Sequence, residues 1–373
     1  MKATVFISSE SVDFMNTLQK HKHLLLLSRG LARYRHTFTE HLAASLPSDV
    51  EVTACPIWGP LWEVDFPALK AQEGRVRYCD LPSHGTLVAQ KNPSVVGIME
   101  YPWLMLREMF AAKRRRLPVI VFSELGNGIP KQRDVKLTTR LMHRFFASFT
   151  DGQVALSPSA QVPFGAPWRP VCFAPHSIDT REFTPRSWDS IPRKCTILCV
   201  AQYTPRKGQD LLAKALAKAK AEHGIDFELR LVGILDERWL DQVLRESGIR
   251  EQSVILGVKQ GDALLNEFRQ ADLFVLPSRF DTYGVVTQEA AACGLPLVIS
   301  RFAGSSQNLV NDGQNGYVVD PHNTAEFSQR LADLIRNPSA WPAMGAHSRA
   351  LAEHYCVRRL SHVVADWMLP WLS

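Results

Sequence analysis

The sequence has no apolar run that approaches the ~20 residues needed to cross a bilayer as a helix, and the leucine run from Leu24 to Leu27 is only a fragment. The first residues, MKATVFISS, carry one lysine and turn polar at Ser8. They therefore predict a first β-strand at residues 3–7 and not a signal peptide. The 7 cysteines form no Cys-x-x-Cys pair and no His/Cys cluster, so we expect a reduced, cytoplasmic protein without a zinc site.

The composition is that of a globular protein of two domains. The chain has 373 residues, of which 46% are hydrophobic and 21% charged, and this length is enough to bury two cores. The net charge of +6 is uneven, since residues 1–180 hold 21 Lys and Arg against 15 Asp and Glu, whereas residues 181–373 hold 22 of each. The excess indicates an anionic partner of the first half, either a membrane surface or an acidic ligand; a solvated basic face is the alternative. No nucleic-acid-binding motif accompanies this charge, so we expect no nucleic-acid partner.

Short apolar runs alternate with helix-like segments along the chain, which is typical of an α/β protein with parallel sheets. Strands are predicted at 50–55, 95–99, 118–122, 153–156, 196–200, 229–232, 254–256, 273–276, 296–300 and 316–318, and helices at 210–222, 237–247, 263–270, 324–336 and 341–355. Two such sets predict two doubly wound, Rossmann-like domains that face each other across a ligand-binding cleft. We place the first domain at 1–175 and the second at 176–357, and expect 358–373 to form a helix that packs back on the first domain.

The segment from Asp281 to Ser300, DTYGVVTQEAAACGLPLVIS, carries two acids eight positions apart in an apolar context. It predicts a short helix between two strands, whose N-terminal N–H groups face the cleft and suit a phosphate. Gly284 allows the backbone to approach a ligand closely. Glu289, one turn into the helix, is placed to accept hydrogen bonds from ribose hydroxyls, and Asp281 from a second sugar. A nucleoside diphosphate sugar fits this arrangement; a solvent-facing acid on a core helix is the alternative.

A basic loop precedes the helix predicted at 210–222. Arg206 and Lys207 lie in this loop, where cations can neutralise a diphosphate leaving group. The sequence contains no Asp-x-Asp, the usual metal clamp for nucleotide sugars. We therefore expect no metal and no cofactor, with protein cations and a helix end in their place; a solvated basic turn is the alternative.

These segments, in this order, resemble the retaining glycosyltransferases of family 4, which have the GT-B fold. The resemblance runs from about Leu27 to the end of the chain and is closest after Val154. APHSIDTREFTP is similar to the family's VIPNGVDxxxFxP, and VAQYTPRKGQDLLAKAL to VGRLVPEKGxDxLLxAF. ADLFVLPSRFDTYGVVTQEAAACGLPLVIS is similar to ADxFVxPSxxEGFGxxxxEAMAxGxPVVAS.

The resemblance implies a role for each acid of the segment 281–300. They form the family's E-x7-E pair, in which Glu289 binds the donor ribose and Asp281 contacts the transferred sugar as part of the catalytic group. The backbone at Tyr283, Gly284 and Val285 is then expected to hold the phosphate and the sugar.

The other donor-site roles follow from the same resemblance. Lys207 takes the diphosphate together with Arg206, and both are counted with the catalytic residues. The backbone of Val258 lies where the nucleobase is recognised. Gln202 occupies the donor-binding position at which the family has a loop arginine, so one phosphate charge is lost and Arg206 is expected to replace it.

Further departures from the family pattern concern three other positions. The first acid is Asp281, one methylene shorter than glutamate, and Pro-Asn-Gly has become Pro175-His176-Ser177. The glutamate of the last motif falls at Asn308. These changes favour an unusual donor or weak activity.

The first half is expected to hold the acceptor. RGLARYRHTFTEHLAASL resembles GGxxRxxxxLAxxL, which places Gly30 near the donor phosphate or the acceptor. PVIVFSELGNG falls where the family often has PVVxTxHD, so Glu124 is expected to orient the acceptor or to act as the carboxylate on the reacting face; a salt-bridged or capping acid is the alternative. Gly126 and Gly128 indicate a flexible acceptor loop. The cluster at 113–116, KRRR, predicts contact with an anionic membrane, or a solvated helix end.

The expected function is thus a retaining, metal-independent transfer of a sugar from a nucleoside diphosphate sugar to a hydroxyl acceptor that can be lipid-linked. The setting implied by the resemblance is cell-surface polysaccharide or glycolipid assembly at the inner face of the membrane. A nucleotide-sugar epimerase or hydrolase on the same scaffold, and a degenerate nucleotide-sugar-binding protein without catalysis, are the alternatives.

Overall fold

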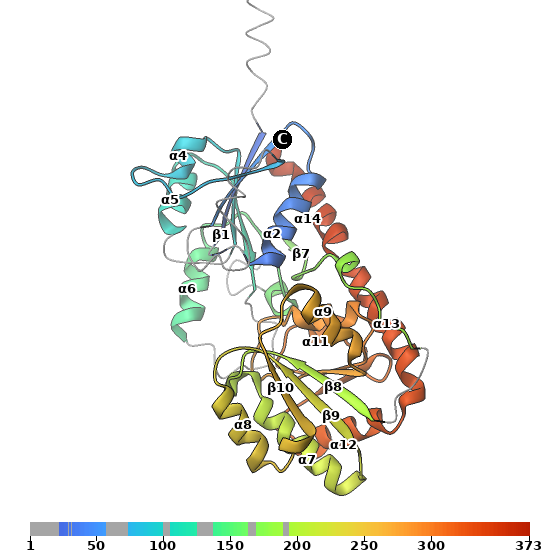
Figure 1. Ribbon diagram of the computed structural model, residues 1–373. Coiled ribbons are helices and arrows are strands. Elements are labelled where there is room, and N and C mark those ends of the chain that lie inside the picture. The colour runs from blue at the N-terminus through green and yellow to red at the C-terminus, as the bar shows by residue number, and fades with distance from the viewer. Residues whose placement is uncertain are drawn as a thin grey trace, which may run out of the picture.

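The computed structural model describes residues 22–28, 30, 32–56, 74–99, 105–124, 137–162, 169–188 and 194–373. They form two α/β domains stacked end to end, each built on a parallel sheet (Figure 1). The predicted strand at 3–7 and the predicted loop glycines Gly126 and Gly128 lie outside the described residues. Within the described residues, no helix is long and apolar enough to cross a membrane.

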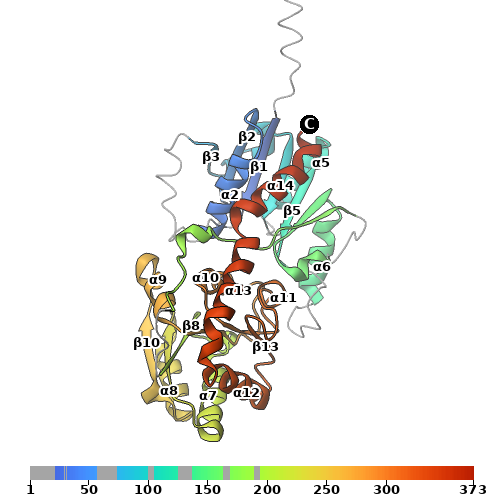
Figure 2. The ribbon, with the colours of Figure 1, turned by 90° about the vertical axis from the view of Figure 1, so that its right-hand side faces the viewer.

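The N-terminal sheet has the strand order β3-β2-β1-β4-β5-β6-β7, with every pair parallel. Its strands are β1 (Lys22–Ser28), β2 (Val50–Pro56), β3 (Val76–Tyr78), β4 (Val95–Met99), β5 (Val119–Ser123), β6 (Gly152–Ala155) and β7 (Val171–Phe173). One apolar core lies beneath α2 (Arg33–Ser45) and the C-terminal helix. A second lies beneath α4 (Leu87–Lys91), α5 (Leu106–Arg114) and α6 (Leu137–Ala147) on the opposite face (Figure 2).

The C-terminal sheet has the order β10-β9-β8-β11-β12-β13, again all parallel. Its strands are β8 (Cys195–Val200), β9 (Phe227–Val232), β10 (Ser253–Gly257), β11 (Leu273–Leu276), β12 (Leu297–Ser300) and β13 (Gly316–Val319). The helices are α7 (Gln209–His223), α8 (Glu237–Glu246), α9 (Gly261–Gln270), α10 (Val286–Ala292), α11 (Ser306–Leu309), α12 (Thr324–Ile335) and α13 (Trp341–His354). They enclose a core on each face of the sheet.

The last helix, α14 (Val357–Leu372), returns to the N-terminal domain and packs against α2. Its side chains at Leu360, Val364 and Met368 are buried in the same core as Leu42 of α2. The two chain segments that cross between the domains are joined where the Val357 amide donates to the Ile178 carbonyl at 3.0 Å. In both views, α13 and α14 form a continuous column that links the two domains (Figures 1 and 2).

The predicted α/β class with two parallel sheets is confirmed, and the strands predicted from residue 50 onward are all present. Three strands were missed: β1, β3 and β7. The most consequential is β1, because its four leucines were taken as a fragment. In the structure Leu24 to Leu27 form the strand between β2 and β4 and are buried on both faces. A strand of a parallel sheet covered on both sides is continuously apolar, and does not alternate.

Candidate functional site

The site forms where the carboxyl ends of the two sheets approach each other. Glu124 directly follows β5, Lys207 lies in the loop after β8, and Asp281 lies in the loop after β11. In an open parallel sheet, loops at the carboxyl ends of the strands are the ones that bind ligands. The predicted residues therefore project from the expected edge of each domain.

Lys207 and Asp281 form an ion pair in the C-terminal domain. The Lys207 ammonium lies 2.6 Å from Oδ2 of Asp281, and the two side chains are only 15% and 11% exposed. The backbone amide of Asp281 is fixed by the Phe302 carbonyl at 3.0 Å. The cation and the first acid of the predicted pair thus meet at one point, although 74 positions separate them in the chain.

The basic loop is held against the end of β11 by Gly208. This residue has φ +76°, and a Cβ there would lie 2.1 Å from the Pro277 carbonyl oxygen, so only glycine fits. Arg206 stays exposed and donates to the Phe280 carbonyl at 3.1 Å. Arg279 binds the Asp210 carboxylate through both terminal nitrogens, at 2.7 and 2.6 Å. Lys207 is consequently the cation that turns towards the predicted donor acid.

The predicted phosphate-binding turn is closely packed. Gly284 has φ +86°, and a Cβ there would lie 2.8 Å from Cδ2 of Leu276. Tyr283 beside it is buried, and its hydroxyl accepts a hydrogen bond from the Asn308 amide at 3.1 Å. Burial raises the pKa of Tyr283 far above its usual value, so the phenol stays neutral. Val285 caps α10, whose first turn carries the half-buried Glu289.

Glu124 is the centre of a charged cluster in the N-terminal domain. Its Oε1 lies 2.7 Å from Nε2 of His176 and 3.2 Å from Nη2 of Arg35. Burial by itself raises the pKa of Glu124, but His176, Arg35 and the Thr282 hydroxyl together hold the pKa well below its usual range. The carboxylate is therefore ionised at neutral pH.

The cluster crosses from one domain to the other. Thr282, next to Asp281 in the C-terminal domain, lies close enough to Glu124 to contribute to the lowered pKa of its carboxyl. The His176 ring packs edge-on against Tyr34 of α2 with centroids 4.9 Å apart, and its centroid is 5.8 Å from that of Tyr283. Predicted residues from both halves of the chain, Glu124 and the segment that begins at Asp281, are thus brought together.

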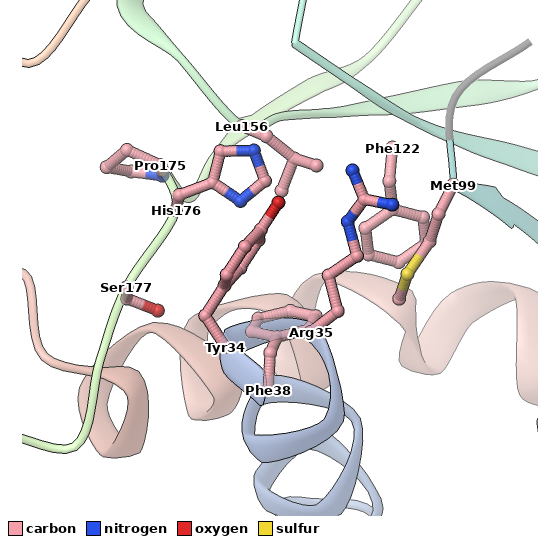
Figure 3. A pocket seen from close by; sticks show the side chains of 9 residues that line it. All are labelled: Tyr34, Arg35, Phe38, Met99, Phe122, Leu156, Pro175, His176 and Ser177. Carbon is pink, nitrogen blue, oxygen red and sulfur yellow. The ribbon is translucent and has the colours of Figure 1, made fainter. Parts of the chain in front are cut away.

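A small cavity of ≈ 20 Å³ lies beside this cluster, at the base of the N-terminal domain. Figure 3 shows His176 and Tyr34 side by side at its edge, with Ser177 on the chain segment that leaves the domain. The Ser177 hydroxyl is buried and has no hydrogen-bond partner among the residues that the structure describes. The lining consists of Tyr34, Arg35, Phe38, Met99, Phe122, Leu156, Pro175, His176 and Ser177.

Three other predicted residues lie in segments that follow strands of the two sheets. Gly30 is half-buried just after β1. Gln202 is exposed, and its carbonyl accepts from the Gln209 side chain at 2.8 Å. Val258 is 54% exposed just beyond β10. Among the described residues, no group of three or more His, Cys, Asp or Glu side chains is placed to hold a metal ion.

Sequence reasoning missed Arg35, His176 and Thr282 as members of the site. His176 had a signal, because it replaces the asparagine of the Pro-Asn-Gly motif. Thr282 lies between predicted residues and was passed over. Arg35 had no signal, since one arginine on an amphipathic helix does not stand out among its neighbours.

Comparisons with known proteins find similar sequences and similar folds. Residues 180–350 match the family described as Glycosyl transferases group 1. This part of the chain is similar to that family. The match contains both the basic loop at Lys207 and the segment from Asp281 to Glu289.

Curated relatives are similar over about half of the chain. The D-inositol 3-phosphate glycosyltransferase of Paenarthrobacter aurescens is 27% identical over 214 residues, which is 54% of this chain and 52% of that protein. A GDP-mannose-dependent α-(1-6)-phosphatidylinositol monomannoside mannosyltransferase of Mycolicibacterium smegmatis is 28% identical over 47% of this chain and 50% of its own length. The chain thus spans about half the length of the curated relatives it matches.

Solved structures match the whole fold. HepE of Anabaena in complex with UDP superposes with a TM-score of 0.75 at 17% identity, covering 94% of this chain and 100% of that one. Sucrose-phosphate synthase of Thermosynechococcus elongatus gives a TM-score of 0.72 at 15% identity, covering 94% and 98%. The two facing Rossmann-like domains are the GT-B fold.

Proposed function

We propose that this protein is a retaining glycosyltransferase that moves a sugar from a nucleoside diphosphate sugar to a hydroxyl acceptor. The observation that carries the proposal is the meeting of two clusters across the cleft: the Lys207–Asp281 pair of the C-terminal domain and the Glu124 cluster of the N-terminal domain, joined through Thr282. The family match over 180–350 supports the donor half of this proposal.

On the donor side, Lys207 supplies positive charge to the diphosphate. In the free protein its ammonium is held by Asp281 at 2.6 Å, so it is oriented over the site before any ligand arrives. A diphosphate is a stronger partner than one carboxylate, because it offers more charge and more acceptor oxygens. Arg206 is exposed within the same turn and is available for a second contact. Together they provide the charge neutralisation that a metal-independent transfer needs.

The remaining donor contacts are assigned by position. Glu289 accepts hydrogen bonds from the ribose hydroxyls, and Asp281 contacts the transferred sugar once Lys207 has turned to the diphosphate. The backbone at Tyr283, Gly284 and Val285 lies against the phosphate and the sugar. Val258 is exposed at the edge of the sheet, which suits recognition of a nucleobase by backbone groups.

On the acceptor side, Glu124 positions the attacking hydroxyl. A carboxylate with a lowered pKa is a weak base, so this role fits Glu124 better than proton abstraction does. The acceptor oxygen attacks the anomeric carbon on the face that the diphosphate leaves. The bond from that carbon to the diphosphate oxygen breaks, and the acceptor proton passes to the departing diphosphate. The products are a glycoside with retained configuration and a nucleoside diphosphate.

A lipid-carried acceptor is the substrate class we favour, with assembly of a glycolipid or cell-surface polysaccharide at the inner face of the membrane as the setting. One relative is named for action on a phosphatidylinositol mannoside, and the excess positive charge of residues 1–180 suits an anionic surface.

The test is a thermal-shift screen of nucleoside diphosphate sugars, followed by turnover with the best binder and by determination of the product's anomeric configuration. Retention with a hydroxyl acceptor is expected. Conversion of the donor without any acceptor would identify an epimerase or hydrolase instead. The departures at Gln202 and Asn308 favour a second candidate, a non-catalytic nucleotide-sugar-binding protein, which would bind donor tightly and turn over none.

A further inference from the structure

Two cysteines lie on neighbouring strands at one edge of the N-terminal sheet. Cys55 lies near the carboxyl end of β2, and Cys79 directly follows β3. The two strands run parallel, with Ala54 paired to Tyr78, so the next pair along them is Cys55 with Cys79. The Cys79 amide donates to the Ala54 carbonyl at 3.0 Å, which extends the pairing of the strands to this position. Both cysteines are thiols in the structure.

The two cysteine side chains lie on the same face of the sheet. Successive residues of a strand face opposite sides. Ala54 and Tyr78 lie in the core beneath α2 and α14, whereas Cys55 lies in the core of the opposite face and Cys79 packs against that core. Neighbouring strands are about 4.8 Å apart, and a disulfide joins Cα atoms about 4.4–6.8 Å apart. The backbone therefore places the two sulfur atoms within reach of each other.

The surroundings of this pair give the two thiols different reactivity. Cys55 is fully buried, whereas Cys79 is half-buried. The neighbouring Cys79 thiol, burial, and the acids Asp80 and Glu108 together hold the pKa of Cys55 far above its usual value. The thiolate is the form of cysteine that attacks an oxidant. Cys55 therefore stays a thiol, and the first attack falls to Cys79.

We propose that Cys55 and Cys79 form a redox-active pair that a hydroperoxide converts to a disulfide. The Cys79 thiolate attacks the peroxide, whose O–O bond breaks; one oxygen stays on the sulfur as a sulfenic acid, and the other leaves as hydroxide or alkoxide. The sulfur of Cys55 then bonds to the sulfur of Cys79, and the sulfenic oxygen leaves as water with the thiol proton of Cys55. The two cysteines lose two electrons, which the peroxide accepts. A small dithiol reverses the reaction by exchange.

Other cysteines are poorly placed to compete with this pair. Cys195 and Cys199 both belong to β8, and a separation of four residues along one strand amounts to about 13 Å. That distance exceeds the span of a disulfide. Cys172 belongs to β7, which lies at the opposite edge of the sheet from β3.

The proposed bond would hold a short edge strand in place. β3 has 3 residues and stands at the end of the strand order, next to β2. A disulfide between Cys55 and Cys79 would close the chain between them into a loop and so reduce the conformational entropy of the unfolded state. This pair requires neither a donor nor an acceptor. The inference is consequently independent of the proposed function.

The test is thiol titration and peptide mapping of the full chain after treatment with hydrogen peroxide. The reduced protein contains 7 thiols, of which two are expected to disappear, with an intact mass lower by two hydrogens. Digestion without reductant is expected to give a peptide that joins Cys55 to Cys79, and dithiothreitol is expected to restore all the thiols. Because the bond constrains the unfolded chain, the oxidised protein is expected to have a Tm roughly 3–5 °C above that of the reduced protein.

Variants of single cysteines separate this pair from general oxidation. Cys79→Ala and Cys55→Ala are each expected to form no disulfide and to show no rise in Tm on oxidation. Alanine adds no polar group to the core, and either variant is sufficient if the other does not fold. Cys172→Ala is the matched control, because it removes a buried cysteine from another strand of the same sheet. It is expected to lose two thiols and to gain in Tm as the unaltered protein does.

Several results of the peroxide treatment would overturn the proposal. One is retention of all the thiols in excess peroxide, and another is a sulfinic acid at Cys79 without any link to Cys55. A disulfide that maps to a different pair, or that joins two chains, would have the same meaning. So would an equal loss of thiols from Cys79→Ala and from the unaltered protein.

Discussion

Replacing Lys207 by methionine removes one charge and keeps an unbranched side chain of similar length. In the proposed reaction, negative charge on the diphosphate grows as the bond to the anomeric carbon breaks. Removing the Lys207 charge therefore destabilises the transition state more than it destabilises the bound donor. Removing one such stabilising group typically costs about 10²–10³ in turnover, whereas donor affinity is expected to fall about tenfold, the effect of one charge-assisted hydrogen bond.

The same change also tests the ion pair with Asp281. Side chains that are 15% and 11% exposed place this pair between a surface pair and a fully buried one. We therefore expect Lys207→Met to cost about 1–3 kcal/mol of unfolding free energy. That corresponds to a fall in Tm of roughly 1–4 °C for a protein of this size. Adding Asp281→Asn removes the orphaned carboxylate, so the double variant is expected to regain part of this stability.

The assay is single-turnover kinetics with saturating donor, together with donor titration and thermal unfolding. Lys220→Met is the matched control, because Lys220 is exposed in the last turn of α7 and far along that helix from the loop. Its kinetics and donor affinity are expected to be unchanged. If Lys207→Met turned over at the rate of the control, the assignment of Lys207 to the leaving diphosphate would be wrong. A loss of Tm without a loss of rate would make the ion pair purely structural.

Three further changes test other parts of the site. Glu289→Ala is expected to weaken donor binding about ten- to hundredfold by removing the acceptor of two ribose hydroxyls, and near-normal affinity in the titration would contradict that role. Gly284→Ala combines φ +86° with a Cβ 2.8 Å from Leu276, so Tm and donor affinity are both expected to fall. The control is Gly224→Ala, which has φ +63° and open space around its Cβ and is expected to lower Tm slightly and leave donor affinity unchanged. Because the pKa of Glu124 is lower in the folded protein, the stabilisation by its carboxylate is complete above the unfolded pKa of about 4.3 and declines as pH falls towards the folded pKa. The Tm difference between the unaltered protein and Glu124→Gln is therefore expected to be largest near neutral pH and to shrink below about pH 4. A Tm difference that does not depend on pH would refute the ionised role.

The C-terminal domain was predictable because its strands are short apolar runs closed by proline or glycine. LFVL before Pro277 and LVIS after Pro296 are too short for helices and each predicts a buried strand. A strand–loop–helix–strand order follows from them. That order also predicted that Lys207 and Asp281 lie at carboxyl ends of strands. Their direct contact at 2.6 Å did not, because it depends on the close approach of Gly208 to Pro277.

The N-terminal domain was less predictable for a physical reason. A run such as HLLLL fits a buried strand and a buried helix equally well, and only its partners β2 and β4 decide. The helix α6 was not predicted from the sequence, and neither was the exposure of its Leu137 and Leu141. Contacts between the domains are harder still to predict from the sequence, since Glu124 and Thr282 become neighbours only when both domains are in place.

The contact between Glu124 and Thr282 gives the two halves of the site a reason to act together. Thr282 is flanked by Asp281, the partner of Lys207, and by Tyr283, which contacts His176. A bound diphosphate that draws Lys207 away would leave Asp281 without its ion-pair partner, next to the residue that faces Glu124. If donor binding changes acceptor affinity through this segment, a filled acceptor site must change donor affinity by the same factor, because coupling between two sites is reciprocal.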